Sequence, residues 1–497
     1  MVRARWLLAA PLLALALGCA GSESRLAGMP CGAVVARGQD ADRPSSLQPV
    51  KKNLWTDPPA APTPVAGVPA CGSPPASPVD AHPILSVNLD CVLRLAEQQN
   101  PQMALARERV NQAFAEKDLA DQRWLPDIHV GSGYYRHEGG IQDQDGTLVR
   151  SSTGALIAGA DLTARVDPRA AAFAKLDAAR RTWQQTGDLR RVTAEVLLDA
   201  AGTYVDLLAA HSGLAIARSL DGDLRSLQSR AEKLANLERG ARVEVVRIDG
   251  EITGQSQLMR KLEGQARAAS AKLAYLLGLD PCTEIVPADE TLVALSLADA
   301  DVSCCELVAK ATTCGPGVKE MEAILCLIHK GMQDAAGPQR FLPVMTAQAL
   351  EGGFGAGPNG GLTFANRFDL GVQARWNLTD LLTADAQRRI GNSLVAQAHL
   401  TYTDLKGKLT LAVQEARESI LSGREQLRLA EEQIKQAQTA RELSDVRLRE
   451  GIQGSSFSEV LMSQRAVAAA RANYLSIMRE YDKAQLRLMV LTGCQKN

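Results

Sequence analysis

Histidines are the first residues to consider for catalysis or metal binding in this chain. The six are His82, His129, His137, His211, His329 and His399. None is paired with another at the four-residue spacing that places two ligands on one face of a helix. The sequence also contains no HExxH motif, no GxSxG nucleophile elbow and no P-loop lysine motif. These observations argue against an enzyme.

A glycine-rich segment from Gly355 to Gly360 fits the pattern GxGxxG of dinucleotide-binding turns. Such a turn must be followed directly by a helix N-terminus, because the phosphate is held by backbone amides and the helix dipole. Here the residues from Leu362 onward lead into a strand. We expect a loop over 351–361 that joins two strands, and no nucleotide site.

Cysteines are the other candidate ligands, with nine in addition to Cys19. Export of the chain would permit disulfides, but the sequence leaves their pairing open. The densest group consists of Cys304, Cys305, Cys314, Cys326 and His329. Because no CxxC spacing occurs in it, we expect packing or a disulfide clip there, and no metal site.

The first residues have the order of a secretory signal peptide. Arg3 and Arg5 precede an apolar run from Trp6 to Leu17, which is too short to span a bilayer. No later segment offers the roughly 18 unbroken apolar residues of a transmembrane helix. If the mature chain enters a membrane, it must therefore do so by an acyl chain or a β-barrel.

A small residue, Gly18, stands directly before Cys19, as in the lipobox at which bacterial lipoproteins are cut and acylated. We therefore expect residues 1–18 to be a lipoprotein signal peptide and Cys19 to carry a covalent lipid. The alternative is an ordinary signal peptide followed by an accidental cysteine. Ala20, in place of Asp, resembles lipoproteins that are sorted to the outer membrane.

Composition bounds the rest of the chain. Only 4% of the 497 residues are aromatic, and Ala, Leu, Arg, Glu and Gln crowd the middle and the end, which is typical of long helices and coiled coils. The formal net charge of -1 gives no support to nucleic-acid binding. Residues 19–84 are rich in Pro, Gly, Ala and Ser without periodicity, and are expected to form a linker.

The remaining sequence looks duplicated, with repeats over 85–300 and 301–497. In each repeat a helix ends at a proline, Pro126 or Pro343, which opens a hairpin of two strands. The expected strands are about 127–137 and 155–166 in the first repeat, and about 344–351 and 362–378 in the second. Strands of about 10 residues cross a membrane only when a closed barrel is completed.

A long helix without proline follows each hairpin, over about 169–239 and about 383–450. Seventy helical residues reach roughly 105 Å, more than a compact domain needs. Both helices end at a glycine, Gly240 or Gly451, which accepts the left-handed conformation that reverses a helix. A return helix then follows. The three-and-four spacing from Leu427 to Ala437 favours a coiled coil of many helices over a hairpin that packs only on itself.

This order of elements resembles the TolC-like outer membrane efflux protein family from about Leu85 to Gly493. The motifs that carry the resemblance are Leu125-Pro126, Leu342-Pro343, the run from Ala201 to Leu208, Val243-Glu244-Val245 and Ser458-Glu459-Val460. The resemblance implies a mainly α fold with a β-barrel part. Tandem-duplicated long helical hairpins and four strands per chain would form, in a trimer, a 12-stranded barrel and an α-helical coiled-coil tunnel.

The resemblance also implies the function and the partners. The chain would be a lipid-anchored homotrimer in the cell outer membrane, extending into the periplasm. It would be the passive exit duct of a tripartite efflux or secretion system, with a periplasmic adaptor (membrane fusion) protein and an inner membrane pump. No cofactor is expected besides the lipid on Cys19, and no nucleic acid.

Site residues follow from the same resemblance. Glu244 and Glu459 match acidic residues that ring the periplasmic gate, although Arg247 and Met462 stand where a second acidic residue is frequent. The alternative is that both glutamates only favour the helix dipole at a helix start. The candidate adaptor-docking tips are Arg239, Gly240, Arg242, Arg449, Glu450 and Gly451.

Two other classes of protein compete with the duct. A lipid-anchored coiled-coil structural lipoprotein of the cell envelope would have no need of two strand pairs of membrane-spanning length. A periplasmic adaptor would carry one helical hairpin flanked by compact β-domains. The chain instead repeats a strand hairpin followed by a long helix, and this duplication disfavours both of these classes.

Overall fold

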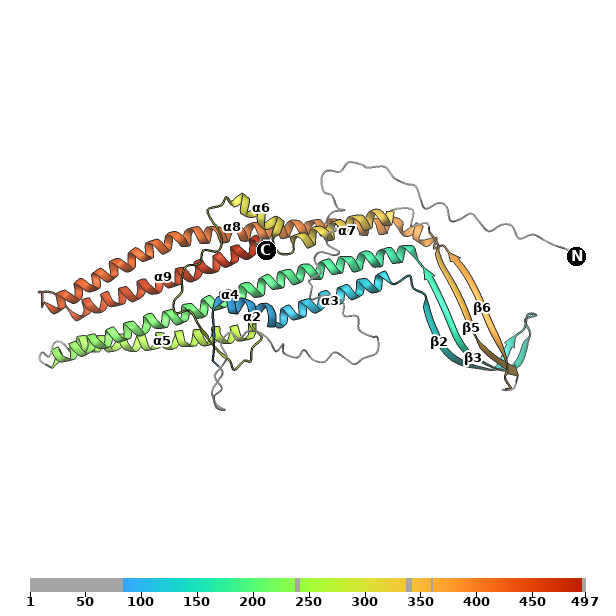
Figure 1. Cartoon of the computed structure of the whole chain (residues 1–497), viewed down its shortest axis with the longest axis horizontal. Coiled ribbons are helices and arrows are strands. Elements are labelled where there is room, and N and C mark those ends of the chain that lie inside the picture. Colours follow the sequence, from blue (N-terminus) through green and yellow to red (C-terminus); the bar gives the residue numbers. More distant parts are fainter. Residues whose placement is uncertain (1–83, 237–241, 337–341, 359–360, 494–497) are drawn as a thin grey trace. The chain divides into compact units, whose positions relative to one another are not determined.

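A computed structural model describes residues 84–236, 242–336, 342–358 and 361–493 of the chain (Figure 1). The expected signal peptide, Cys19, nearly all of the linker, and the tip residues Arg239 and Gly240 lie outside the described residues. The described fold is mainly helical with one four-stranded sheet, as the sequence predicted.

The same order of elements occurs twice. The first half contains α2 (Leu89–Gln99), α3 (Pro101–Asp121), β2 (Asp127–Gln142), β3 (Leu148–Val166), α4 (Pro168–Ala235) and α5 (Arg242–Leu276). The second half contains α6 (Cys304–Cys314), α7 (Val318–Ala336), β5 (Val344–Pro358), β6 (Thr363–Arg375), α8 (Thr379–Arg449) and α9 (Phe457–Thr492). A short parallel pair, β1 (Ile84–Val87) with β4 (Glu284–Pro287), was not anticipated from the sequence.

The single helix expected before the first hairpin is wrong, because the chain breaks at Asn100. Residues that precede a proline are disfavoured in the helical conformation, and Asn100 is extended before Pro101. Its side chain caps α3 by accepting from the backbone amides of Gln102 (2.8 Å) and Met103 (3.1 Å), and donates to the Leu276 carbonyl (2.8 Å). Asn100 therefore ties the start of α3 to the end of α5.

The four long strands form one antiparallel sheet in the order β2-β3-β5-β6, so that β3 and β5 join the two halves. β2 and β3 extend further than expected, up to the pair Gln142 and Leu148. The turn between them is closed by a hydrogen bond from the Asp143 amide to the Thr147 carbonyl (2.9 Å), with Gly146 at φ 81°. Residues 138–154, which separate the two expected strands, are therefore mostly strand themselves.

The loop expected from residue 351 is also wrong, since β5 continues to Pro358. Its glycines allow close approach across the ladder. A Cβ on Gly355 would lie 2.6 Å from a ring atom of Phe364, and one on Gly352 would lie 2.4 Å from the Ala158 carbonyl oxygen of β3. The GxGxxG pattern thus begins inside a strand.

Alternation along the strands gives the sheet two different faces. One row across all four strands consists of Ile128, Leu162, Ala349 and Leu370, and the next consists of His129, Asp161, Leu350 and Asp369. Residues directly opposite each other point to the same face, and successive residues point to opposite faces. One face is therefore mostly apolar, apart from Glu351 and, toward the β2–β3 turn, Arg136, Glu138 and Arg150, and the other face carries most of the charged groups. The apolar face is exposed in the single chain, for example at Ile128 and Val372.

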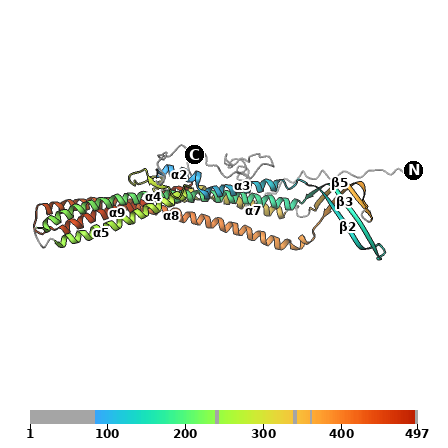
Figure 2. The same ribbon diagram turned by 90° about the horizontal axis from the view of Figure 1, so that it is seen from below.

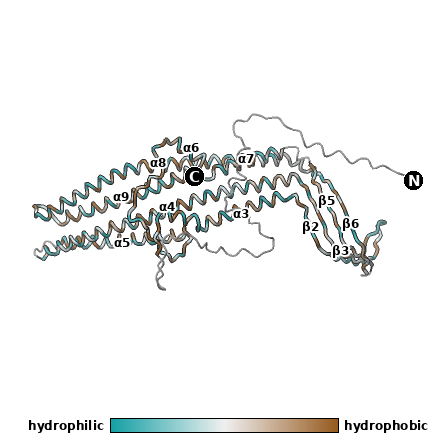
Figure 3. The backbone as a smooth tube through the Cα atoms, viewed as in Figure 1, coloured by the Kyte–Doolittle hydropathy of each residue, from teal (hydrophilic) through white to brown (hydrophobic). Residues whose placement is uncertain are grey.

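The helices form two hairpins, α4 with α5 and α8 with α9, and α4 lies along α9 (Figure 2). Hydrophilic and hydrophobic residues alternate along them (Figure 3). One core cluster joins α2, α4 and α5, a second joins α6, α8 and α9, and a third joins α4, α5 and α9 near the hairpin ends. No helix in the described residues is long and apolar enough to cross a membrane.

Removing the cap at the α2–α3 break should destabilise the fold. Asn100→Ala leaves two α3 amides and the Leu276 carbonyl without partners, and should cost about 1–3 kcal/mol in the free energy of unfolding. Chemical denaturation followed by circular dichroism measures this. The matched change Gln112→Ala, on the exposed face of α3, should stay within about 0.5 kcal/mol of wild type. Equal effects of the two changes would contradict the assignment.

Candidate functional site

The candidate site is built where the two hairpins end. Glu244 lies in the first turn of α5, and Glu459 lies in the first turn of α9. Ser456 caps α9 and accepts a hydrogen bond from the Glu459 amide (3.2 Å). Ser458 donates from Oγ to Oε2 of Glu244 (2.7 Å). The structure therefore brings the starts of α5 and α9 together, and with them both glutamates expected from the sequence.

Apolar packing holds these two helix starts in place. Phe457, Val460 and Leu461 of α9 lie in one buried cluster with Ile248 of α5 and with Leu220, Leu224, Leu227 and Ala231 of α4. Burying side chains of this size is worth about 1.5–3 kcal/mol each. The polar contacts between Glu244 and Ser458 thus lie beside an apolar contact that fixes their spacing.

Arginines compensate both glutamates. Arg247 reaches Glu244 with Nη1 3.1 Å from Oε1, and Arg447 reaches Glu459 with Nη1 2.9 Å from Oε1. Arg247 also donates to the Ser458 hydroxyl. Two carboxylates and two guanidinium groups cancel in formal charge. A negative potential at this place would therefore be weaker than bare glutamates give.

Ion pairs also join the two hairpins through α4 and α8. Arg230 places both Nη1 and Nη2 at 2.9 Å from Oδ1 of Asp445, and Arg441 places Nη1 3.3 Å from Oδ2 of Asp223. Asp445 also pairs with Arg449 (2.6 Å). The side chains of Arg230 and Asp445 are only 34% and 24% exposed, so water screens this pair less than a pair on an open surface.

These cross-hairpin pairs have no local signal in the sequence. Their partners lie 215 and 218 positions apart in the chain, and each residue alone looks like any charged residue of a coiled coil. Only the packing of α4 near α8 selects them.

The remaining tip residues are placed as follows. Arg242, Arg449, Glu450 and Gly451 are exposed, and Gly451 has the left-handed conformation (φ 64°) expected of a glycine that ends a helix. Arg449 is held by Asp445 within the chain.

The expected disulfide clip does not include Cys304 or Cys305, which are thiols. Cys91 and Cys326 each take part in a disulfide bond. In the described part of the chain, no group of three or more His, Cys, Asp and Glu side chains is placed to hold a metal ion.

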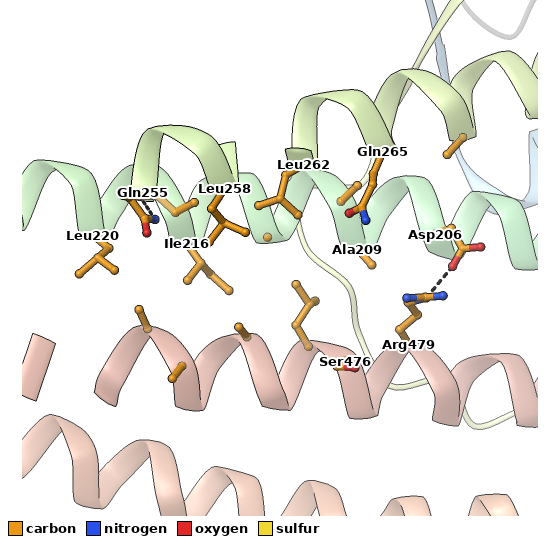
Figure 4. Close-up of a pocket in the computed structure, with 18 of the residues that line it drawn as sticks. Asp206, Ala209, Ile216, Leu220, Gln255, Leu258, Leu262, Gln265, Ser476 and Arg479 are labelled. Atoms are coloured by element: carbon orange, nitrogen blue, oxygen red, sulfur yellow. Dashed lines mark hydrogen bonds and ion pairs between the residues drawn. The ribbon is translucent and has the colours of Figure 1, made fainter. Parts of the chain in front are cut away.

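A groove of about 660 Å³ lies between α4, α5 and α9 (Figure 4). It adjoins the apolar cluster at the hairpin ends, to which Leu220 also belongs. Its walls are mainly alanine and leucine. The ion pair between Asp206 and Arg479 (2.6 Å) closes one end, and Gln255 lies toward the other, where it donates to the Ala217 carbonyl (2.9 Å). The two hairpins are thus in contact at the tip and near Asp206, with a hollow in between.

Comparison with known proteins places this geometry in a class. Residues 355–494 match a family model described as outer membrane efflux protein. A search of curated proteins found no match.

Solved structures share the fold over 82% of this chain. The outer-membrane channel OprN is 18% identical, with 89% of its chain covered and a TM-score of 0.66. The CmeC outer membrane channel of Campylobacter jejuni is 13% identical, with 85% covered and a TM-score of 0.66. The MtrE outer membrane channel of Neisseria gonorrhoeae, in its open state, is 15% identical, with 89% covered and a TM-score of 0.61.

The described chain therefore has the fold of outer membrane channel proteins. The resemblance to the outer membrane efflux protein family that the sequence predicted is confirmed.

Loss of the shared carboxylate should loosen the contact between the hairpins. Asp445→Asn removes the charge that holds both Arg230 and Arg449, and should raise hydrogen exchange about fivefold in the last turns of α4 and α8, which corresponds to about 1 kcal/mol for a partly exposed pair. Asp404→Asn is the control, because Asp404 pairs with Lys408 within α8 alone. Exchange that responds equally to both changes would rule out a cross-hairpin role.

Proposed function

We propose that this chain is the outer membrane channel of a tripartite efflux or secretion system and exports solutes passively. The observation that carries the proposal is the four-stranded sheet with one exposed apolar face and two open edges, β2 and β6. Strands of 13 to 19 residues are long enough to cross a membrane. The apolar face suits lipid, and the charged face suits an aqueous lumen.

Closure of the barrel requires other copies of the chain. In lipid, every backbone amide and carbonyl must be hydrogen-bonded, so the open edges of β2 and β6 have to pair. Three copies of a four-stranded sheet make a 12-stranded barrel in which β2 of one copy pairs with β6 of the next. The helical hairpins of the trimer would then form the coiled-coil tunnel across the periplasm.

The partners and the energy source follow from this role. A periplasmic adaptor would dock at the hairpin tips, including Arg239, Gly240, Arg242, Arg449, Glu450 and Gly451, and an inner membrane pump would supply the energy. The similarity to channels supports a protein that catalyses no reaction. We further propose a covalent lipid on Cys19 and no other cofactor.

The cation preference of the gate would depend on both signs of charge. Glu244 and Glu459 would attract cations, whereas the paired Arg247 and Arg447 would oppose this attraction. Three copies would bring six carboxylates and six guanidinium groups to the constriction. The gate of this chain would therefore be only weakly cation-selective.

Single-channel recording in a planar lipid bilayer tests the duct and its gate together. We expect stable conductance steps from the purified wild type. Glu244→Gln with Glu459→Gln should lower the ratio of cation to anion permeability, and Arg247→Gln with Arg447→Gln should raise it, because each pair removes one sign of charge.

The outcomes separate the duct from the gate. Steps whose selectivity is unchanged in both variants would keep the duct and discard the gate residues. A monomeric preparation that never conducts would contradict the duct and favour the alternative, a lipid-anchored coiled-coil structural lipoprotein.

Lipid attachment has a separate test. Cys19→Ser should abolish incorporation of radiolabelled palmitate, because the acylated thiol is removed. Cys282→Ser, which changes an exposed thiol in the described chain, should leave the label unchanged. Label that persists in the Cys19 variant would contradict lipidation at this residue.

A further inference from the structure

The segment that joins the two repeats, residues 288–303, runs between β4 and α6 without regular structure. We call it the inter-repeat strap. It buries Ala300 in the cluster of α6, α8 and α9, and its Leu292 and Leu295 lie against Ala201 and Val205 of α4. The strap therefore packs against elements of both halves.

Side chains of α9 bind the backbone of the strap. The Leu295 amide donates to Oδ1 of Asp482 (2.8 Å), and the amides of Leu297 and Ala298 donate to Oε1 of Gln485 (3.3 and 2.9 Å). Gln485 in turn donates from Nε2 to the Tyr481 hydroxyl (3.0 Å). These bonds hold one stretch of the strap on two successive turns of α9.

Asp482 differs from Gln485 because, within the described part of the chain, only one of its two polar side-chain atoms has a hydrogen-bond partner. It is 0% exposed, and its Oδ2 has no hydrogen-bond partner among the described residues. Leu486, one turn further along α9, packs against Ala201 and Val205, so the surroundings on this face are apolar. Asp482 is thus a buried carboxyl group with one oxygen left without a partner.

The charged groups around Asp482 are engaged elsewhere. Arg479 and Lys483 of α9 both contact Asp206 of α4 (2.6 Å each). On the strap, Asp289 accepts from the Tyr204 hydroxyl of α4, and Asp301 pairs with Arg424 of α8. Tyr474 of α9 interacts electrostatically with the carboxyl group, and its hydroxyl donates to Oε1 of Glu431 on α8 (3.3 Å). Among the described residues, no cation forms an ion pair with Asp482.

Burial of this carboxyl group raises the pKa of Asp482 to about 6, and the hydrogen bond from the Leu295 amide only partly opposes the effect. A raised pKa in an acid means that the buried position of Asp482 in the folded chain favours the protonated form, whereas the hydrogen bond from the Leu295 amide favours the ionised form. The contribution of Asp482 to the stability of the folded state is therefore fully present below its ordinary pKa of about 4. It is lost as the pH rises through 6.

We propose that the inter-repeat strap is an acid-strengthened latch: it stays packed on α9 while the buried Asp482 is neutral, and ionisation of this buried carboxyl group loosens it. The latch follows from the contacts of the strap and does not depend on conduction. Its consequence rests on the proposed function: in a duct, a loosened strap would release α9 from α4 where the two hairpins meet at Asp206 and Arg479.

Hydrogen exchange of the full-length protein tests the latch. We would measure exchange of the Leu295, Leu297 and Ala298 amides between pH 4.5 and 7.5, corrected for the intrinsic pH dependence. As the pH rises from 4.5 to 7.5, the equilibrium constant for opening of these amides should increase by about tenfold to a hundredfold. This range follows from the difference between the raised pKa of Asp482 and its ordinary value. In Asp482→Asn, which cannot ionise, the opening should be independent of pH.

Asp289→Asn is the matched control, because it removes a carboxylate on the strap that bonds Tyr204 and leaves Asp482 in place. It should keep the pH dependence. A wild-type strap whose opening does not change with pH, relative to the interior of α8, would overturn the proposal even if Asp482→Asn does not fold. A pH dependence that survives in a folded Asp482→Asn would overturn it as well. Neither result depends on whether the chain conducts, so failure of the latch and failure of the duct remain distinguishable.

Discussion

The hydrogen-bonding edges of the four-stranded sheet are the constraint on which the rest of the molecule depends. Each chain offers β2 and β6 as edges, and an apolar face that water does not favour. In lipid, unpaired amides and carbonyls cost several kcal/mol each, so in the proposed membrane channel other copies would complete the sheet. The duplication of hairpin and helix then follows, since each half supplies two strands to the sheet and one long hairpin to the helical part.

The helical part is organised by contacts at separate levels. An apolar cluster and ion pairs join the hairpins at the tip, a groove separates them further along, and the inter-repeat strap joins them again. The polar contacts at the tip are mostly ion pairs between partly exposed groups, each worth about 1 kcal/mol or less. Contacts of this strength would suit the proposed gate, which would have to hold at rest and yet separate when a partner binds.

Much of the fold was predictable because its signals are local. Pro126 and Pro343 mark where helices give way to strands. Long stretches without proline mark the helices α4 and α8, and Gly451 marks the end of α8. The errors also have local causes. Asn100 reads as an interior helix residue until its contact with Leu276 is known, and the glycines of β5 read as a loop because their role, room for Phe364, depends on the neighbouring strand.

The candidate site was less predictable, because it depends on residues more than 200 positions apart. Glu244 and Glu459 were found from their position after the tips, but their neutralisation by Arg247 and Arg447 appears only once the side chains are placed. Asp482 gave no signal at all. An aspartate in a charged helix looks exposed, and its burial appears only once the strap and the neighbouring helices are packed against α9.

The central claim is that the sheet edges pair between copies, and photo-crosslinking in the native membrane tests it most directly. A photoreactive phenylalanine analogue at Tyr134 of β2 should crosslink to β6 of a second copy, giving dimers and trimers whose linked peptides come from differently labelled chains. A chain that stays monomeric under the same irradiation, with no crosslink from β2 to β6, would contradict the account.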